Sequence, residues 1–434
     1  MKNGYKLVII GAGSVYTPEI FNEIIKRWHR LPIREIALVD IEEGKKEAKI
    51  IEAFGRRMFG AQNIECKLSL TLDRKEALKG ADFVINQLRA GRMAAREADE
   101  KLGIDLGIIG QETTGAGGFV NALRTIPIAV QIARDIEQVC PDAWLVNFAN
   151  PSGIVTEAIL KNSSAKCVGL CNVPVNMQSD IAKILGVQSD LVHCRFVGLN
   201  HLSFVTAAEY NGEDVLPEVL DKIGGNETIM KNIPKVPGVG ELTKKLGIIP
   251  SPYLQYYYFE NEMLKKQIDE WEKNKVTRSV LVSQVNNTLF EKYSDESLTA
   301  PPPELSNRGG SLYSFAALNI MEALTGEDGV ELVVNTSNNG AVYGLEDDDV
   351  VETNCIVSKS GIKPLPFGKL PDSISGIVKM IKQYERLTVE AAIEHSREKA
   401  LWALLNHPLI HGFNNAKSIL MKAAQLHKDY IYLQ

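Results

Sequence analysis

The sequence lacks the features that mark membrane, nucleic-acid-binding and disulfide-stabilised proteins. No apolar run approaches the roughly 18 residues of a membrane-spanning helix, and no basic block stands out from a formal net charge of -6. The six cysteines are scattered without a CxxC pair, which favours reduced thiols over a disulfide framework. We therefore expect a cytoplasmic protein with neither a membrane nor a nucleic-acid partner.

Composition and length indicate a globular chain of two domains. Apolar residues make up 45% and charged residues 24% of the 434 positions, as in ordinary soluble proteins. A chain of this length exceeds one ordinary hydrophobic core, so we expect two closely joined domains. The pattern of the sequence changes near Ala165, which predicts one domain over residues 1–165 and a second over residues 166–434.

The first half alternates strand-like and helical stretches. Short apolar runs that end in polar residues occur at 6–10, 35–40, 82–86 and 143–147. This alternation predicts an α/β fold built on a doubly wound parallel sheet. Two further strand candidates follow, at 166–170 and 194–198. Beyond them, long polar helices, a strand-rich stretch at 330–357 and a helical end from 374 predict a mixed α+β second domain.

A glycine turn follows the first predicted strand. The glycines of Gly11-Ala-Gly13-Ser14 allow the backbone to approach a pyrophosphate at the start of the next helix. Tyr16 replaces the third glycine of the usual fingerprint, while Asp40 ends the second strand, where an acid accepts ribose hydroxyls. The pattern predicts a Rossmann-like domain that binds NAD through Gly11, Gly13, Ser14 and Asp40. A flavodoxin-like domain without a dinucleotide is the alternative.

Three polar residues follow later strands and are expected at the carboxyl edge of the sheet, where open parallel sheets bind ligands. Asn150 lies in Asn147-Phe-Ala-Asn-Pro151 and is placed to face a ligand hydroxyl, although an Asn-Pro pair also starts ordinary turns. Cys171 and His201 each come directly after an apolar run. A thiolate and an imidazole suit a divalent metal with open positions. A buried thiol and a histidine satisfied in the core are the plain alternative.

Phenols and arginines supply further candidates. Tyr253 and Tyr256 belong to a tyrosine-rich segment, and either phenol is a possible base if a cation lowers its pKa. Aromatic packing explains such a segment equally well. Arg92 and Arg96 share one helical face just after the 82–86 strand and favour a bidentate phosphate anchor, while solvated arginines are the commoner case.

Several linked motifs give the chain a family resemblance. The motifs, in order along the chain, are Gly11-Ala-Gly-Ser-Val-Tyr-Thr-Pro18, Gly110-Gln-Glu-Thr-Thr-Gly-Ala-Gly-Gly118, Asn147-Phe-Ala-Asn-Pro151, Gly169-Leu-Cys-Asn-Val-Pro174, Gly198-Leu-Asn-His201 and Arg308-Gly-Gly-Ser-Leu-Tyr-Ser314. With these motifs in family order, the sequence resembles glycoside hydrolase family 4 over essentially its whole length, in the branch of the 6-phospho-β-glucosidases. The Cys-Asn-Val-Pro form of the fourth motif is the one that resembles this branch.

The resemblance implies both a fold and a reaction. The fold is a Rossmann-like domain followed by a mixed α+β domain, as in lactate and malate dehydrogenases. The reaction is hydrolysis of 6-phospho-β-glucosides, such as phosphorylated cellobiose or aryl glucosides. It proceeds through NAD-mediated oxidation at C3, loss of the C2 proton, elimination of the aglycone, addition of water and re-reduction. The implied cofactors are NAD and a divalent metal, normally manganese.

The resemblance also assigns roles to residues. Because Tyr256 lies one helical turn after Tyr253, the choice between these two phenols stays open. An asparagine at position 172 cannot protonate the leaving oxygen, as an acid does in α-acting relatives. The implied roles are metal binding by Cys171 and His201, C2 deprotonation by Tyr253 near Glu112, contacts to sugar hydroxyls by Asn150 and Asn172, and substrate or phosphate binding by Arg96 and Arg278.

Other readings differ in chemistry. A conventional NAD-dependent 2-hydroxyacid dehydrogenase would share the first 150 or so residues, but it would release NADH and use a His–Asp relay that the sequence does not suggest. An α-specific or other phosphoglycosidase of the same family and a nucleotide-sensing regulator without turnover are further alternatives. Relatives form dimers or tetramers, so we expect a homodimer or a homotetramer.

Overall fold

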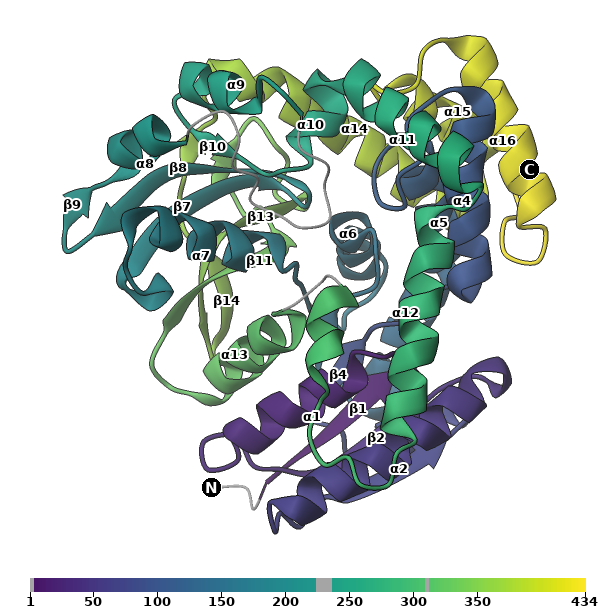
Figure 1. The fold of residues 1–434 in the computed structure, drawn as a ribbon, viewed down its shortest axis with the longest axis vertical. Coiled ribbons are helices and arrows are strands. Elements are labelled where there is room, and N and C mark those ends of the chain that lie inside the picture. The colour runs from purple at the N-terminus through teal and green to yellow at the C-terminus, as the bar shows by residue number, and fades with distance from the viewer. Residues whose placement is uncertain (1–3, 224–235, 309–311) are drawn as a thin grey trace.

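The computed structural model describes residues 4–223, 236–308 and 312–434 of the chain. Residues 309–311 of the Arg308–Ser314 motif therefore lie outside the described part. A large twisted sheet runs through the molecule with helices packed on both faces (Figure 1). No helix in the described ranges is both long and apolar enough to cross a membrane.

Six parallel strands form the first part of a nine-stranded sheet. Their order is β3-β2-β1-β4-β5-β6, the doubly wound order of Rossmann folds. The central strands β1, β4 and β5 are buried almost throughout, because helices cover both faces of the sheet. The strands are β1 (Tyr5–Ile10), β2 (Ile33–Val39), β3 (Lys67–Thr71), β4 (Phe83–Asn86), β5 (Trp144–Asn147) and β6 (Lys166–Gly169). The predicted Rossmann-like α/β fold is confirmed.

Two hydrophobic cores lie on opposite faces of this sheet. Leu7 and Ile9 of β1 pack in the core that includes α1 and α2, whereas Val8 and Ile10 belong to the core that includes α5. Successive side chains of a strand point to opposite faces, so one apolar run serves both cores. The helical elements of this half are α1 (Thr17–Lys26), η1 (Glu42–Gly44), α2 (Lys45–Ala61), α3 (Arg74–Leu78), α4 (Arg92–Leu106), α5 (Gly115–Val139), α6 (Ser152–Asn162) and α7 (Val173–Leu185).

The second half of the chain extends the large sheet and adds a smaller one. β11 pairs antiparallel with β6, and β13 and β14 follow it to the sheet edge. A second antiparallel sheet has the order β10-β8-β7, with β9 paired to β8. The strands are β7 (Val192–Leu199), β8 (Leu202–Tyr210), β9 (Glu213–Asp214), β10 (Ile249–Pro250), β11 (Val330–Ser337), β12 (Val342–Tyr343), β13 (Val350–Ser358), β14 (Gly361–Pro364) and β15 (Gly368–Lys369).

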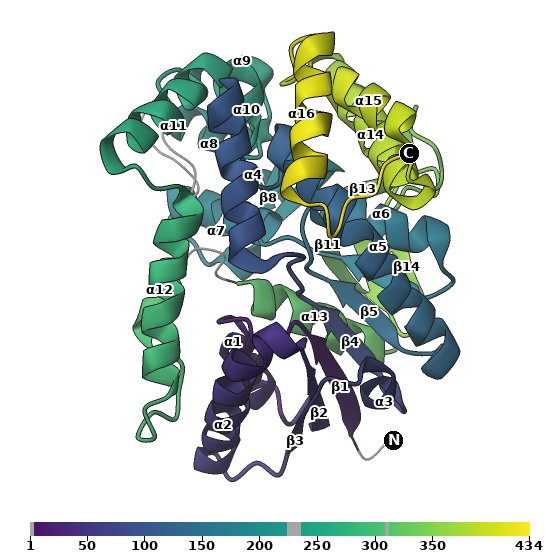
Figure 2. The ribbon, with the colours of Figure 1, turned by 90° about the vertical axis from the view of Figure 1, so that its right-hand side faces the viewer.

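Helices enclose this half and connect it to the first. α12 packs against both α2 and α4, and α16 packs against α4 (Figure 2). The helical elements are η2 (Ser189–Leu191), α8 (Leu216–Lys222), α9 (Val239–Leu246), α10 (Leu254–Tyr258), α11 (Glu260–Asn274), α12 (Arg278–Tyr293), η3 (Pro303–Arg308), α13 (Tyr313–Thr325), α14 (Asp372–Glu394), α15 (Arg397–Leu405) and α16 (Phe413–Leu426).

The two halves of the chain share one sheet. β6 lies beyond residue 165, yet it continues the parallel order of the first half and pairs with β11 of the second. The division into domains 1–165 and 166–434 therefore stays a prediction. What the shared sheet does establish is that side chains from both halves reach the same carboxyl edge.

A buried lysine links α14 to α6. Lys382 is 1% exposed, and its Nζ lies 2.7 Å from Glu157 Oε2 and 2.5 Å from Glu385 Oε2. Replacing Lys382 with methionine leaves the buried Glu385 without its cation and Glu157 with Lys161 alone, so we expect the free energy of unfolding to fall by about 3–5 kcal/mol. Urea unfolding followed by circular dichroism measures this loss. The exposed Lys379 on the same helix is the matched control, and equal losses in the two methionine variants would contradict the prediction.

Candidate active site

A cavity of about 960 Å³ opens at the carboxyl ends of the parallel strands. Every residue that the sequence analysis assigned to cofactor, substrate or catalysis lines this cavity, and so does His201. Cys171 does not line it but lies directly behind, with Sγ 3.8 Å from Asn172 Oδ1 and 3.9 Å from Tyr313 Oη. The structure thus brings the predicted residues into one place. Their individual roles stay predictions.

The glycine turn after β1 packs against the end of β2. Gly11 has a φ of +80°, and a Cβ there would lie 3.0 Å from the backbone of Leu88. The carboxylate of Asp40 accepts hydrogen bonds from the backbone N–H of Gly13 at 2.6 Å and of Ile41 at 2.8 Å. Asp40 therefore shapes the turn and keeps further lone pairs for hydroxyl donors. This arrangement fits a dinucleotide that lies along the turn.

His201 occupies the tight turn between β7 and β8. Leu199 pairs with Leu202, and His201 adopts a φ of +63° in the two-residue loop between them. The backbone N–H of Ser251 donates to Ser203 O at 2.7 Å. This hydrogen bond holds the segment before Tyr253 next to the turn that carries His201. The rings of His201 and Tyr253 stack with centroids 3.9 Å apart and planes within 1°. A predicted metal ligand and a predicted base are therefore in direct contact.

The donor atoms behind and beside the cavity fit a divalent metal. Burial lowers the pKa of His201 to about 4, so the imidazole is neutral and able to ligate. Burial raises the pKa of Cys171 to about 12, and a bound cation would have to displace the thiol proton. The buried Asn150 Oδ1 has no hydrogen-bond partner in the described structure. Nitrogen, sulfur and amide oxygen together suit a borderline ion that keeps open positions.

The protein supplies few metal ligands of its own. No group of three or more His, Cys, Asp and Glu side chains that could hold a metal is present within residues 4–223, 236–308 and 312–434. A two-residue pair leaves most coordination positions to ligand oxygens, which is the pattern of catalytic rather than structural sites.

Two phenols compete for the role of base. Tyr253 and Tyr256 both line the cavity, with ring centroids 5.9 Å apart and planes tilted by 48°. Burial raises the pKa of both hydroxyls well above that of free tyrosine. The charge of Arg278 opposes this rise in the pKa of Tyr256. Of these two, Tyr253 stacks on His201, which favours Tyr253 over Tyr256 as the base.

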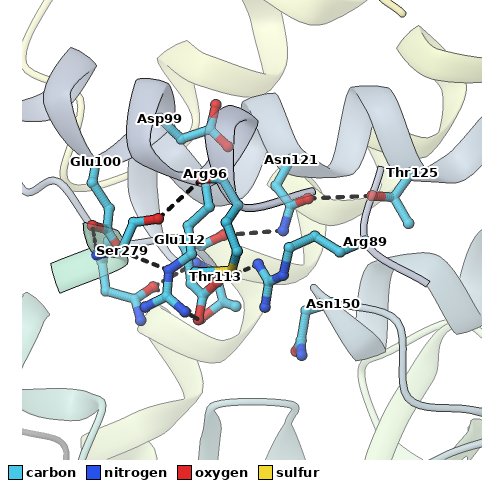
Figure 3. A network of polar contacts seen from close by, with 12 residues as sticks. Arg89, Arg96, Asp99, Glu100, Glu112, Thr113, Asn121, Thr125, Asn150 and Ser279 are labelled. Atoms are coloured by element: carbon cyan, nitrogen blue, oxygen red, sulfur yellow. Dashed lines mark hydrogen bonds and ion pairs between the residues drawn. The ribbon is translucent and has the colours of Figure 1, made fainter. Parts of the chain in front are cut away.

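A network of arginines and carboxylates forms one wall of the cavity (Figure 3). Glu112 lies between two guanidinium groups, with Oε1 3.1 Å from Arg96 Nη1 and Oε2 2.5 Å from Arg89 Nη1. Arg96 also donates from Nε to Glu100 Oε1 at 2.8 Å. Glu100 in turn accepts from the backbone N–H of Ser279 at 2.8 Å, next to Arg278. The network therefore joins α4 to the start of α12 and orients Arg96 at the cavity wall.

Two residues of the site escaped the sequence analysis. Tyr313, at the start of α13, lines the cavity and stacks on Phe148 at 5.9 Å. It lies within the motif Arg308–Ser314, which was an available signal. Glu352 lies inside the buried strand β13 and influences Cys171. The polar triplet Glu352-Thr-Asn354 within an apolar strand was its only signal.

A histidine–aspartate pair exists, but it lies away from the cavity. His427 Nε2 is 2.9 Å from Asp99 Oδ1, and Arg124 binds the same carboxylate through Nη1 at 2.9 Å and Nη2 at 2.6 Å. All three side chains are buried, and neither His427 nor Asp99 lines the cavity. The cluster fastens the chain after α16 to α4. It does not resemble the proton relay of a 2-hydroxyacid dehydrogenase.

The fold and the site define a class of protein. A Rossmann-type sheet with a glycine turn, an imidazole and several phenols around one cavity is typical of an α/β enzyme that uses a dinucleotide. Residues 6–187 match the model of the family 4 glycosyl hydrolases, and residues 196–410 match that of the family 4 glycosyl hydrolase C-terminal domain. The chain belongs to glycosyl hydrolase family 4.

Named relatives are similar over their full length. A Bacillus subtilis (strain 168) protein named "Probable 6-phospho-beta-glucosidase" is 43% identical, with 99% of this chain and 98% of the relative covered. The 6-phospho-beta-glucosidase of Escherichia coli (strain K12) is 37% identical, with 99% and 97% covered. The structure of the 6-phospho-beta glucosidase from Thermotoga maritima with manganese, NAD+ and glucose-6-phosphate has a TM-score of 0.90 and 34% identity, covering 99% of this chain and 100% of that one.

Proposed function

We propose that this chain hydrolyses 6-phospho-β-glucosides with the aid of NAD and a divalent metal such as Mn2+. The observation that carries the proposal is that the glycine turn, His201 and Tyr253 line one cavity, with Cys171 directly behind its wall. A hydrolase that worked through two carboxylates alone would need neither the turn nor the thiol. The names of the relatives support the phosphorylated β-glucoside as substrate.

NAD and the metal would supply one part of the chemistry, and side chains of the protein would supply the other. When bound, NAD would accept and return the hydride of the sugar C3, and the cation would polarise the oxygens at C2 and C3 and lower the pKa of nearby acids. With the cation nearby, the Tyr253 phenol would lose its own proton to water, and the resulting phenolate would take the C2 proton. The stacking of its ring on that of His201 supports a place next to the proposed metal ligands.

Substrate binding falls to the polar wall of the cavity. Arg96 and Arg278 bind the substrate, at least one of them at its phosphate, because guanidinium groups match phosphate oxygens. Asn150 and Asn172 contact sugar hydroxyls, and the unpaired Asn150 Oδ1 is ready to accept one. Glu112 keeps Arg96 in place through its ion pair. Since Asn172 carries no acidic proton, the leaving oxygen takes its proton from water.

Hydrolysis of p-nitrophenyl β-glucoside 6-phosphate tests the proposal. We expect nitrophenol release that requires both NAD and Mn2+ under reducing conditions, without net NADH, because the hydride returns in each turnover. Nitrophenol absorbance and NADH absorbance are followed together. NADH that accumulates without nitrophenol would indicate a dehydrogenase instead. Nitrophenol release without either additive would contradict the redox route.

Assembly and location complete the proposal. We infer a cytoplasmic enzyme because all six cysteines are free, and the metal site needs Cys171 as a reduced thiol. We also infer a homodimer or a homotetramer. Trp402 on α15 is 52% exposed, and Phe413 and Met421 on α16 are 53% and 47% exposed. Large apolar side chains on neighbouring helices support an interface between copies of the chain.

A further inference from the structure

Glu352 is a buried carboxylate in the middle of β13. It is 0% exposed and stands opposite Asn335 of β11 in the large sheet. Carboxylates are seldom buried this completely without a charged partner, since loss of hydration is costly. Within the described part of the chain, no lysine, arginine or histidine forms an ion pair with Glu352, although many other acids have such a partner.

All the hydrogen bonds of Glu352 come from neutral donors. Asn200 Nδ2 donates to Oε1 at 3.0 Å, and Asn335 Nδ2 donates to the same oxygen at 3.2 Å. Ser203 Oγ donates to Oε2 at 2.7 Å. Both carboxylate oxygens thus act as acceptors, as an ionised carboxylate does. Burial raises the pKa of Glu352, and the three hydrogen bonds oppose that rise. When it is ionised, the carboxylate is held by three neutral groups, and no cation of the described residues forms an ion pair with it.

The donors of Glu352 flank His201. Asn200 and Ser203 lie on either side of His201 in the positive-φ turn that carries the imidazole. The Glu352 carboxylate therefore accepts hydrogen bonds from both sides of that turn. Asn200 also accepts a hydrogen bond through Oδ1 from the backbone N–H of Gly153 at 3.4 Å. Gly153 lies in the first turn of α6, just after Asn150. The carboxylate therefore connects the His201 turn with the segment that carries Asn150.

Glu352 also reaches the other side of the metal pair. Asn335 pairs with Gly169 at the end of β6, two residues before Cys171. The Glu352 carboxylate is near enough to Cys171 to act on it electrostatically. Asn200, which donates to Glu352, also forms a hydrogen bond with the Cys171 thiol. One anion thus lies behind both residues that the proposed function assigns to the metal.

We propose that Glu352 is a positioning residue that braces the His201 turn and supplies the buried negative charge needed to hold a divalent cation between Cys171 and His201. The inference rests on the proposed function, because it presumes that these two residues bind a metal. Groups that orient ligands from behind commonly change metal affinity by about 10–100-fold. A cation in front of the site would balance the charge that the protein itself leaves unpaired.

Cobalt binding to the Glu352→Gln variant tests the inference without turnover. Glutamine keeps the size of the side chain and an acceptor oxygen but removes the charge. We expect the dissociation constant for Co2+ to rise by about 10–100-fold, with a weaker thiolate-to-cobalt charge-transfer band, while NAD affinity stays unchanged. Glu331→Gln is the matched control, because Glu331 of the neighbouring strand β11 also accepts from an asparagine, Asn354, at 2.8 Å but is exposed.

The outcomes separate this inference from the proposed function. Equal Co2+ affinity and equal charge-transfer bands in wild type and Glu352→Gln would overturn the positioning role and leave the proposed function intact. Wild-type protein without any thiolate–cobalt band would overturn both. If Glu352→Gln loses NAD binding and so does not fold, Ser203→Ala decides, because it keeps the charge and removes one brace. We expect a loss of Co2+ affinity of less than about tenfold in Ser203→Ala, and unchanged affinity would overturn the inference.

Discussion

Replacing His201 with alanine is expected to lower turnover of the aryl phosphoglucoside by at least about a hundredfold, because the site loses one of the two protein ligands that we propose for the metal. NAD affinity should stay unchanged, since Asp40 bonds to the glycine turn while His201 stacks on Tyr253. Steady-state kinetics with added Mn2+ measure the first quantity. Quenching of protein fluorescence by NAD measures the second.

Two further variants sharpen this prediction. Cys171→Ser should produce a loss of similar size, because a serine hydroxyl is a far weaker ligand than a thiolate. His193→Ala is the control, since His193 lies on the same strand pair as His201 but is exposed. Activity that survives in His201→Ala, or wild-type activity in metal-free buffer, would refute the metal assignment. A loss of NAD binding in His201→Ala would indicate a folding defect instead.

The large sheet was predictable where its strands are short apolar runs. Residues 6–10 and 82–86 read as buried parallel strands and form β1 and β4. The run Lys67–Thr71 has charged and polar positions and an incompletely buried pattern, so the edge strand β3 gave no comparable signal. β8 follows β7 after a turn of two residues, and this turn contains histidine rather than the usual Asn-Gly pair. The residues of this turn therefore do not predict the β7–β8 hairpin.

The sequence could predict those site residues that directly follow a strand. Asn150 and Cys171 follow β5 and β6 directly, so the geometry of parallel sheets placed them at one edge. Glu352 depends on pairings between segments far apart in the chain, such as the contact of β13 with β11. The ion pair between Arg96 and Glu112 likewise joins α4 to the loop before α5. Side-chain spacing in the sequence cannot specify contacts of this kind.

Replacing Tyr253 with phenylalanine is expected to abolish exchange of the substrate C2 proton with deuterium from solvent and to lower turnover by about 10²–10⁴-fold. The reason is that a ring without a hydroxyl still stacks on His201 but cannot accept the proton. Metal binding and NAD binding should therefore survive. Nuclear magnetic resonance of the sugar in D2O follows the exchange, and p-nitrophenol release follows turnover.

Tyr256→Phe is the matched control, because its phenol lines the same cavity from one helical turn further along. Tyr256 does not stack on His201, and its hydroxyl is influenced by Arg278 and Glu100 on the arginine-rich wall. We therefore expect Tyr256→Phe to raise KM while C2 exchange continues. If C2 proton exchange stops in Tyr256→Phe and persists in Tyr253→Phe, then Tyr256 is the base and Tyr253 is the binding residue. Contact with the imidazole is therefore the observation that assigns Tyr253, rather than Tyr256, the proposed role of base.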